Sequence, residues 1–547
     1  MAENKRHEKF IIASGGTGMR CLQAFVNMCA IGVFGDDKFN ILLIDTDEEN
    51  KDKRNTEKLI DSYKFLKKRT RGEYFSADLE LHSFVPDYST DSTRDFVRLS
   101  QIELDNTDLN MRLANIFFEE EVQEFDLSHG YRAQTHLGSY LMYHAIIDEV
   151  RSAQKDSTKI ATSQLYQFIK KVVDSNGNGG RVFAFGSSFG GTGASSIPVI
   201  PRAISDAGQI AIDGAIEINN IYFGGVVLSS YFNFNPPSAD QLERERVIAN
   251  SQFFGHNSAA ALSYYINDPT ILKKYKHLYL LGWPSARKIY VETYKEKYLG
   301  VKNDGQTKTG GKHQENPAHV IELMAVSAAY HFMNEKILPE ATLKNYDKTQ
   351  FLYKSLEVVD SEYYEISEDD VIPKTDDSSV SSDTLTEDKR FINNAISFYT
   401  LGSMLQGSFE NNLESLLKNL TYYNNSFSLN EDEIEQLTFF LNYFNKMKYG
   451  DNQFKPGWFT QMFLTFEENL QEHAFFGMPS KLFDHTINKQ EWALAYKELS
   501  KKKPENEFIR QFKKSNKDNG GGLAEFLNAM KKTFDSMELN QQSKTEE

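Results

Sequence analysis

Two segments of the chain share one construction, and that construction limits the folds available to it. Residues 10–18 read FIIASGGTG and residues 182–201 read VFAFGSSFGGTGASSIPVIP, so each has an apolar run followed by a glycine-rich loop. Glycine allows close backbone approach and positive φ, and a helix that starts at such a loop presents free N–H groups to an anion. The repetition predicts two phosphate-binding loops that contact a single ligand.

The apolar runs predict a parallel sheet. They show little alternation, as expected of strands buried on both faces, and helical patterns separate them. We therefore predict an α/β fold with a doubly wound, mainly parallel sheet and a ligand at the carboxyl ends of the strands. The expected strands are 10–14, 40–45, 79–85, 181–186, 220–230 and 277–282. A long helix is expected to begin with Asn316 as N-cap and Pro317 at its first position.

The length of 547 residues is too great for one core and indicates more than one domain. We expect a nucleotide-binding domain at 1–338 and an acidic linker or divergent segment at 339–388. A mainly helical C-terminal domain is expected at 389–547. Residues 357–388 hold 12 acidic residues and one lysine, a composition typical of weakly ordered segments. Phenylalanine and tyrosine are dense beyond residue 389, and we interpret them as core residues.

Charge and hydropathy exclude several classes of protein. The net charge of −16 without a basic stripe argues against direct nucleic-acid binding. No apolar run approaches the roughly 18 residues that cross a bilayer, and the first residues are charged, so we expect no membrane insertion and a cytoplasmic location. Cys21 and Cys29 form no metal-binding pattern.

Several segments resemble the tubulin/FtsZ superfamily and follow one another along the chain in the order of that family. The chain would be a divergent prokaryotic tubulin-like member. The resemblance extends over residues 10–338 and implies a GTPase domain of the cytoskeletal type. FGSSFGGTGASSIPVIP is similar to the signature glycine loop of that family. The other matching segments are FIIASGGTGMRCLQAF, ILLIDTDEEN, GYRAQTHLGSYLMYHA, VVLSSYFNFNPP, HLYLLGWP and the helix opened by Asn316.

The resemblance implies a site for GTP or GDP with Mg²⁺. The first loop would hold the α and β phosphates through Gly15, Gly16, Thr17 and Gly18, with Arg20 and Cys21 beneath them. Asp45, Thr46 and Asp47 would lie near the β and γ phosphates, with Asp47 as the metal ligand. Ala133, Gln134 and Thr135 would border the γ phosphate. The second loop would grip the phosphates with Gly190, Gly191, Thr192, Gly193, Ala194 and Ser195. Asn235 would approach the ribose and Asn316 the base.

The chain departs from the family after the long helix. The segment LPEATLKNYDKTQF lacks the acidic motif that positions water in FtsZ, so no catalytic residue is assigned. Phosphoryl transfer depends on such positioning, and hydrolysis is expected to be weak or partner-dependent. Self-association into filaments or oligomers is implied, and the helical C-terminal region could bind a protein partner. An insertion is expected at 284–311, and GQTKTGGKH, which overlaps its end, is expected to be a surface loop.

Two alternatives remain open. GGTGMR after a strand, with Asp45 at the end of the next, also resembles a dinucleotide-dependent Rossmann oxidoreductase. That interpretation leaves the second glycine loop unexplained. A third possibility is a non-catalytic scaffold of a multi-protein bacterial system, for example in genome defence, with a degenerate nucleotide site.

Overall fold

The protein is described by a computed structural model. The structure describes residues 7–355 except 87, 89–115, 120–126, 128–129, 212–217, 246–247, 284–287, 300–301, 303–304, 306–309 and 312–315. It also describes 358–359, 362–363, 426–444, 446–449, 453–456, 458, 461, 510–512, 514, 516 and 520–536.

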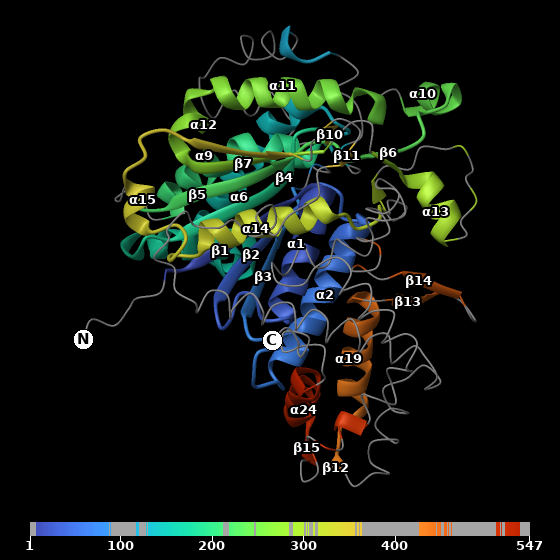
Figure 1. Cartoon of the computed structure of the whole chain (residues 1–547). Coiled ribbons are helices and arrows are strands. Elements are labelled where there is room, and N and C mark those ends of the chain that lie inside the picture. Colours follow the sequence, from blue (N-terminus) through green and yellow to red (C-terminus); the bar gives the residue numbers. More distant parts are fainter. Residues whose placement is uncertain are drawn as a thin grey trace.

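The centre of the molecule is a seven-stranded sheet in which every pairing is parallel (Figure 1). The strand order is β3-β2-β1-β4-β5-β7-β9, so the chain reverses its direction of growth between the adjacent strands β1 and β4. This arrangement confirms the predicted α/β class with a mainly parallel sheet. The strands are β1 (Lys9–Ser14), β2 (Lys38–Ile44), β3 (Asp78–Phe84), β4 (Arg181–Ser187), β5 (Tyr222–Leu228), β7 (Tyr275–Gly282) and β9 (Gln350–Ser355).

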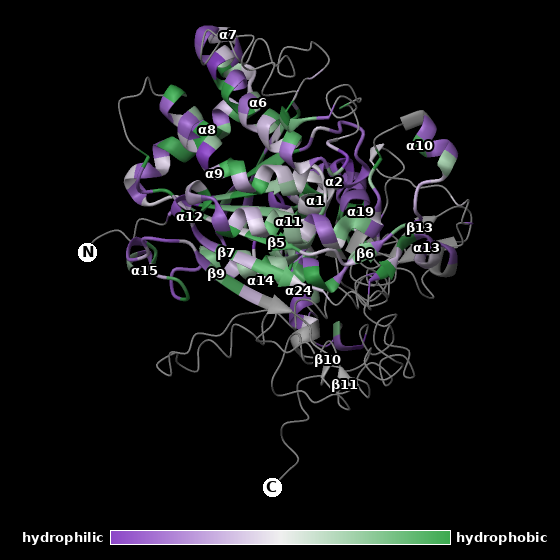
Figure 2. Ribbon diagram, turned by 90° about the horizontal axis from the view of Figure 1, so that it is seen from above, coloured by the Kyte–Doolittle hydropathy of each residue, from purple (hydrophilic) through white to green (hydrophobic). Residues whose placement is uncertain are grey.

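Helices cover both faces of the sheet because the strands are apolar on both sides. In β1, Ile11 and Ala13 pack into the core on one face, whereas Phe10 and Ile12 pack into the core on the other. Figure 2 shows apolar residues along the central strands and hydrophilic ones on the outlying helix α7 (Ser157–Thr162). The first face carries α1 (Gly15–Ala30), α2 (Lys51–Lys67) and α14 (Val320–Met333). The second carries α6 (Thr135–Lys155), α8 (Gln164–Asp174), α9 (Thr192–Ala211), α11 (Phe254–Asn267) and α12 (Pro269–Lys274).

Helix α14 begins later than the sequence pattern predicts. Its N-cap is His319, whose Nδ1 accepts the Ile321 N–H at 3.1 Å, while Glu322 Oε2 accepts the His319 N–H at 3.1 Å. This capping box satisfies amide groups at the helix start, so Asn316 and Pro317 lie before the helix. The prediction that Asn316 caps the helix is wrong.

Strand β9 lies in the segment expected to be an acidic linker. Its residues pair with β7, with Leu352 opposite Tyr279 in the register. The sheet therefore continues beyond residue 338 to Ser355. The acidic residues 364–388 lie outside the described part of the chain.

The described part of 389–547 packs beside α2. It contains helices α19 (Glu431–Phe444) and α24 (Leu523–Ser536), and short strand pairs β12 (Ser426–Phe427) with β15 (Gly520–Gly521) and β13 (Lys446–Tyr449) with β14 (Gln453–Pro456). The ring of Phe440 lies 5.0 Å from that of Phe75, and Ser62 Oγ donates to the Gln436 carbonyl at 3.2 Å. These aromatic side chains contribute to the core, as expected. Among the helices that the structure describes, none has the length and apolarity to span a membrane.

Candidate ligand-binding site

The two glycine loops meet at the carboxyl ends of the neighbouring strands β1 and β4. Gly15 follows β1 directly and has a φ of +67°. A Cβ at Gly15 would lie 2.9 Å from the Gly193 nitrogen and 3.2 Å from the Thr192 Cβ. The Ser14 hydroxyl donates to the Thr192 carbonyl at 3.3 Å. The reversal of strand order between β1 and β4 thus brings the two loops into direct contact, at the edge where α/β sheets bind ligands.

A third loop, residues 130–133, closes against the second. A Cβ at Gly191 would lie 3.0 Å from the nitrogens of both Arg132 and Ala133. Arg132 and Ala133 both have positive φ, 45° and 67°, an unfavourable conformation for residues with side chains. Such strain persists only where the surrounding structure imposes it, and it is commonly found at functional sites.

The three loops and neighbouring segments enclose one pocket of about 120 Å³. Seven of its lining residues are glycines, which allow a ligand to approach the backbone closely. The lining residues are Ser14, Gly15, Gly16, Thr17, Asp45, Asp47, Asn50, Gly130, Tyr131, Arg132, Ala133, Ser187, Phe189, Gly190, Gly191, Thr192, Gly193, Phe232, Phe234, Ala249, Phe254 and Gly310.

Two helix N-termini reach this pocket. Helix α1 contributes its first residues Gly15, Gly16 and Thr17, and α9 contributes Thr192 and Gly193. The Ser14 side chain does not cap α1, since its hydroxyl is directed to the second loop. Unpaired N–H groups and the helix dipole at such ends favour a negatively charged ligand.

Two carboxylates lie in the pocket beyond the end of β2. Asp45 and Asp47 are each 2% exposed, and Asn50 Nδ2 donates to Asp45 Oδ2 at 2.9 Å. Burial, with a smaller contribution from the Asp47 carboxylate, raises the pKa of Asp45 to about 7. The Gly311 N–H donates to Asp47 Oδ2. The loop GQTKTGGKH was expected at the surface, yet Gly310 within it lines the pocket.

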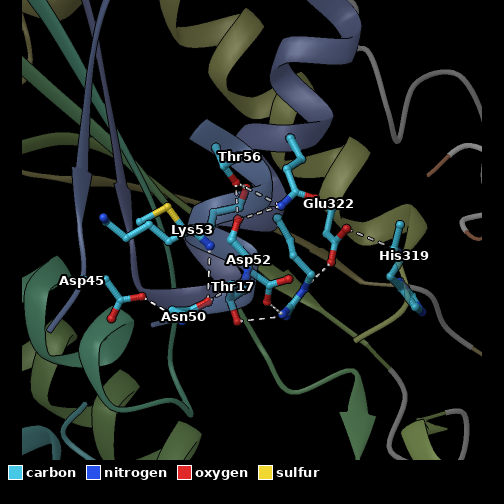
Figure 3. A network of polar contacts seen from close by, with 12 residues as sticks. Thr17, Asp45, Asn50, Asp52, Lys53, Thr56, His319 and Glu322 are labelled. Carbon is cyan, nitrogen blue, oxygen red and sulfur yellow. Dashed lines mark hydrogen bonds and ion pairs between the residues drawn. The ribbon is translucent and has the colours of Figure 1, made fainter. Parts of the chain in front are cut away.

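Behind the first loop, the buried guanidinium of Arg20 joins three elements. It donates to Asp52 at 3.0 Å, to Glu322 at 2.9 Å and, through Nη2, to the Thr17 hydroxyl at 3.3 Å. Burial opposes its charge, but Tyr231, Asp52 and Glu322 hold the pKa of Arg20 above its usual value. Figure 3 shows this network running from Asp45 through Asn50 and the start of α2 to Glu322 and His319 at the start of α14.

The structure brings half of the predicted site residues to the pocket wall. These are Gly15, Gly16, Thr17, Asp45, Asp47, Ala133, Gly190, Gly191, Thr192 and Gly193. The others do not line it: Gly18, Arg20, Cys21, Thr46, Gln134, Thr135, Ala194, Ser195, Asn235 and Asn316.

Several of the residues outside the wall support it. A Cβ at Gly18 would lie 2.7 Å from the Phe185 carbonyl oxygen, so glycine allows α1 to pack closely on β4. The Ser195 hydroxyl contacts the carbonyls of Thr135 and Gly191, at 3.2 and 2.7 Å. The Thr46 and Thr192 hydroxyls lie 3.2 Å apart. These contacts join the loops to one another.

The sequence reasoning missed Asn50, Arg132, Gly310 and a group of phenylalanines. Among the described lining residues, Arg132 alone carries a positive charge. Arg132 could have been predicted from its position between Gly130 and the predicted site residue Ala133. Asn50 could have been found as a helix cap, because its side chain accepts the N–H groups of Asp52 and Lys53 at the start of α2.

Comparison with known proteins gives no relative: no family model, no curated protein and no solved structure matches the chain.

Proposed function

We propose that this protein binds a nucleoside diphosphate or triphosphate, with GTP or GDP as the ligand implied by the resemblance to tubulin and FtsZ. The main support is the convergence of three loops, two of them at helix N-termini, on one pocket. Backbone amides at such ends favour phosphate groups. Arg132 adds a positive charge to the same wall.

The paired carboxylates support binding of the nucleotide together with Mg²⁺. Asp45 and Asp47 facing a triphosphate would repel it, and a divalent cation between them removes that repulsion. Mg²⁺ in nucleotide sites uses one or two carboxylates and completes its shell with phosphate oxygens and water. The two residues fit this pattern, and Asp47 is the proposed ligand. The bound ion would neutralise phosphate charge.

Turnover and self-association remain separate predictions. No acidic group is assigned to position water, so the protein is proposed to bind nucleotide tightly and hydrolyse it slowly. Phosphate release should be measured over a range of protein concentrations. A rate per molecule that rises with concentration would support catalysis between associated copies, and a constant rate would support a monomeric switch. Absence of release would favour the scaffold hypothesis.

The dinucleotide-dependent oxidoreductase remains a second candidate because of two observations. The order of the first six strands matches that of dinucleotide-binding domains, and Asp45 lies beyond the end of β2. Its weakness is the second glycine loop, which in this hypothesis has no assigned role. NAD⁺ and NADP⁺ therefore belong in the binding experiment.

Isothermal titration calorimetry would test the proposal with GTP and GDP, in Mg²⁺ and in EDTA. We expect micromolar or tighter binding that Gly193→Asp abolishes, since the new carboxylate would lie beside the phosphates. Gly177→Asp is the matched control, because a Cβ there meets open space and the residue does not line the pocket. Equal affinities in wild type and Gly193→Asp would refute the site, and tighter binding of NAD⁺ than of GTP would favour the oxidoreductase.

A further inference from the structure

Most aromatic side chains of the pocket come from another part of the chain than its polar side chains do. The polar ones lie on the β1–α1, β2–α2, 130–133 and β4–α9 loops. The segments after β5 contribute Phe232, Phe234, Ala249 and Phe254, and Phe189 from the second glycine loop joins them. The pocket therefore has a phosphate end and an aromatic end.

At the aromatic end, four phenylalanines pack on one another. The centroid of the Phe254 ring lies 4.9 Å from that of Phe189 and 5.4 Å from that of Phe234, and the Phe189 and Phe232 rings are 5.6 Å apart. All four side chains are at most 7% exposed. We call Phe189, Phe232, Phe234 and Phe254 the phenylalanine cluster.

The residues expected to read the ribose and the base by hydrogen bonds do not reach this end. Asn235 and Asn316 are absent from the pocket wall, and the described residues that line its aromatic end are phenylalanine and alanine. Phenylalanine has no hydrogen-bonding group for the edge of a base. It does offer a ring face, and aromatic stacking tolerates any base because every base has a π face.

We infer that the pocket selects its ligand by the triphosphate and stacks the attached base on the phenylalanine cluster without distinguishing guanine from adenine. This inference rests on the proposed function and makes the substrate class nucleoside triphosphates in general. Sites that hydrogen-bond a group on the ligand reject an analogue without it by roughly 10⁴-fold or more, whereas apolar pockets discriminate by about 10–200-fold. Guanine and adenine both offer a ring face to the cluster, so we expect GTP and ATP to differ by less than about 10-fold, below the low end of that range.

The size of the pocket favours recognition through the phosphates. Its volume of about 120 Å³ is below the roughly 300–1,000 Å³ typical of sites for drug-sized ligands. A base must therefore separate rings that already pack together and replace ring–ring contacts with ring–base contacts. The net affinity that the base adds is therefore limited, and inorganic tripolyphosphate should bind within about 100-fold of GTP.

The test is a calorimetric titration of the full chain with GTP, ATP, CTP and inorganic tripolyphosphate, all in Mg²⁺. Similar affinities for GTP and ATP would support the inference. If GTP binds and ATP binds more than about 100-fold more weakly, the inference is overturned while the proposed function still stands. If none of the four compounds binds, the proposed function itself is refuted.

A variant of the phenylalanine cluster tests whether the base stacks there. Phe234→Ala should weaken GTP and ATP by the same factor, about 5–50-fold for one lost stacking contact, and leave tripolyphosphate unchanged. Phe253→Ala is the control, because its side chain is 57% exposed and does not line the pocket. A loss for GTP alone would mean that the cluster reads the base, contrary to the inference. The wild-type series decides the question if Phe234→Ala does not fold.

Discussion

Replacing Gly15 with alanine tests whether contact between the two glycine loops shapes the pocket. The φ of +67° costs a residue with a Cβ about 1–2 kcal/mol. The new Cβ would also lie 2.9 Å from the Gly193 nitrogen, so one backbone must move, and such overpacking costs about 1–3 kcal/mol. We expect Gly15→Ala to lower the free energy of unfolding by about 2–5 kcal/mol in total. Displaced loops should also reduce GTP affinity by about 10-fold or more.

Gly35→Ala separates the two contributions. Gly35 has a φ of +54°, and a Cβ there meets no atom within 4 Å, so only the conformational cost applies. Urea denaturation should show a loss of about 1–2 kcal/mol for Gly35→Ala, with unchanged GTP affinity by calorimetry. The reasoning fails if Gly15→Ala is no less stable than Gly35→Ala and binds GTP like the wild type.

Three further predictions concern charged residues. Arg132→Ala should weaken triphosphate binding by about 10–150-fold, the value of a hydrogen bond to a charged group, with Arg132→Lys intermediate; unchanged calorimetric affinity would contradict this. Arg20→Met leaves the buried carboxylates of Asp52 and Glu322 without their cation, and it should lower the free energy of unfolding in urea by about 3–5 kcal/mol. Arg202→Met is the control, because the exposed ion pair between Arg202 and Asp206 should contribute only about 0–1 kcal/mol. Equal losses of unfolding free energy for Arg20→Met and Arg202→Met would refute the stabilising role of Arg20. Asp47→Asn should remove most of the increase in GTP affinity caused by Mg²⁺, measured against EDTA; a full Mg²⁺ effect in this variant would exclude Asp47 as the ligand.

The sequence was sufficient for those parts of the fold that depend on local pattern. Apolar runs without alternation specify buried parallel strands, and the predicted strand at 181–186 corresponds to β4. The meeting of the two loops follows from the same logic, because each loop directly follows a strand and those two strands are neighbours in the sheet. Gly15 and Gly193 were identifiable because the loops need glycine at those positions.

Long-range pairing explains what the sequence could not provide. Strand β9 is short and precedes an acidic stretch, and only its pairing with β7 identifies it as part of the sheet. Arg20 lies just after the first glycine loop, but its partners Asp52 and Glu322 are 32 and 302 residues away in sequence. No local signal distinguishes a guanidinium under phosphates from one that joins three helices.

Competition between local signals explains the error at α14. Asn316 followed by Pro317 is a strong helix-start pattern, yet His319 and Glu322 form a reciprocal capping box three residues later. The phenylalanine cluster illustrates a different limit. Aromatic residues are usually core, and whether Phe234 also faces a cavity depends on how it packs against Phe254 of α11.

The pocket wall is assembled from segments spread between Ser14 and Gly310, with long stretches of chain between them. Contacts of such sequence separation form only when the sheet itself forms, so an unfolded chain has no comparable site. A ligand of this pocket would bind the native state alone and add about 2.7 kcal/mol to its stability at a concentration 100 times the dissociation constant. The lifetime of the folded protein in a cell would then rise and fall with the supply of that ligand.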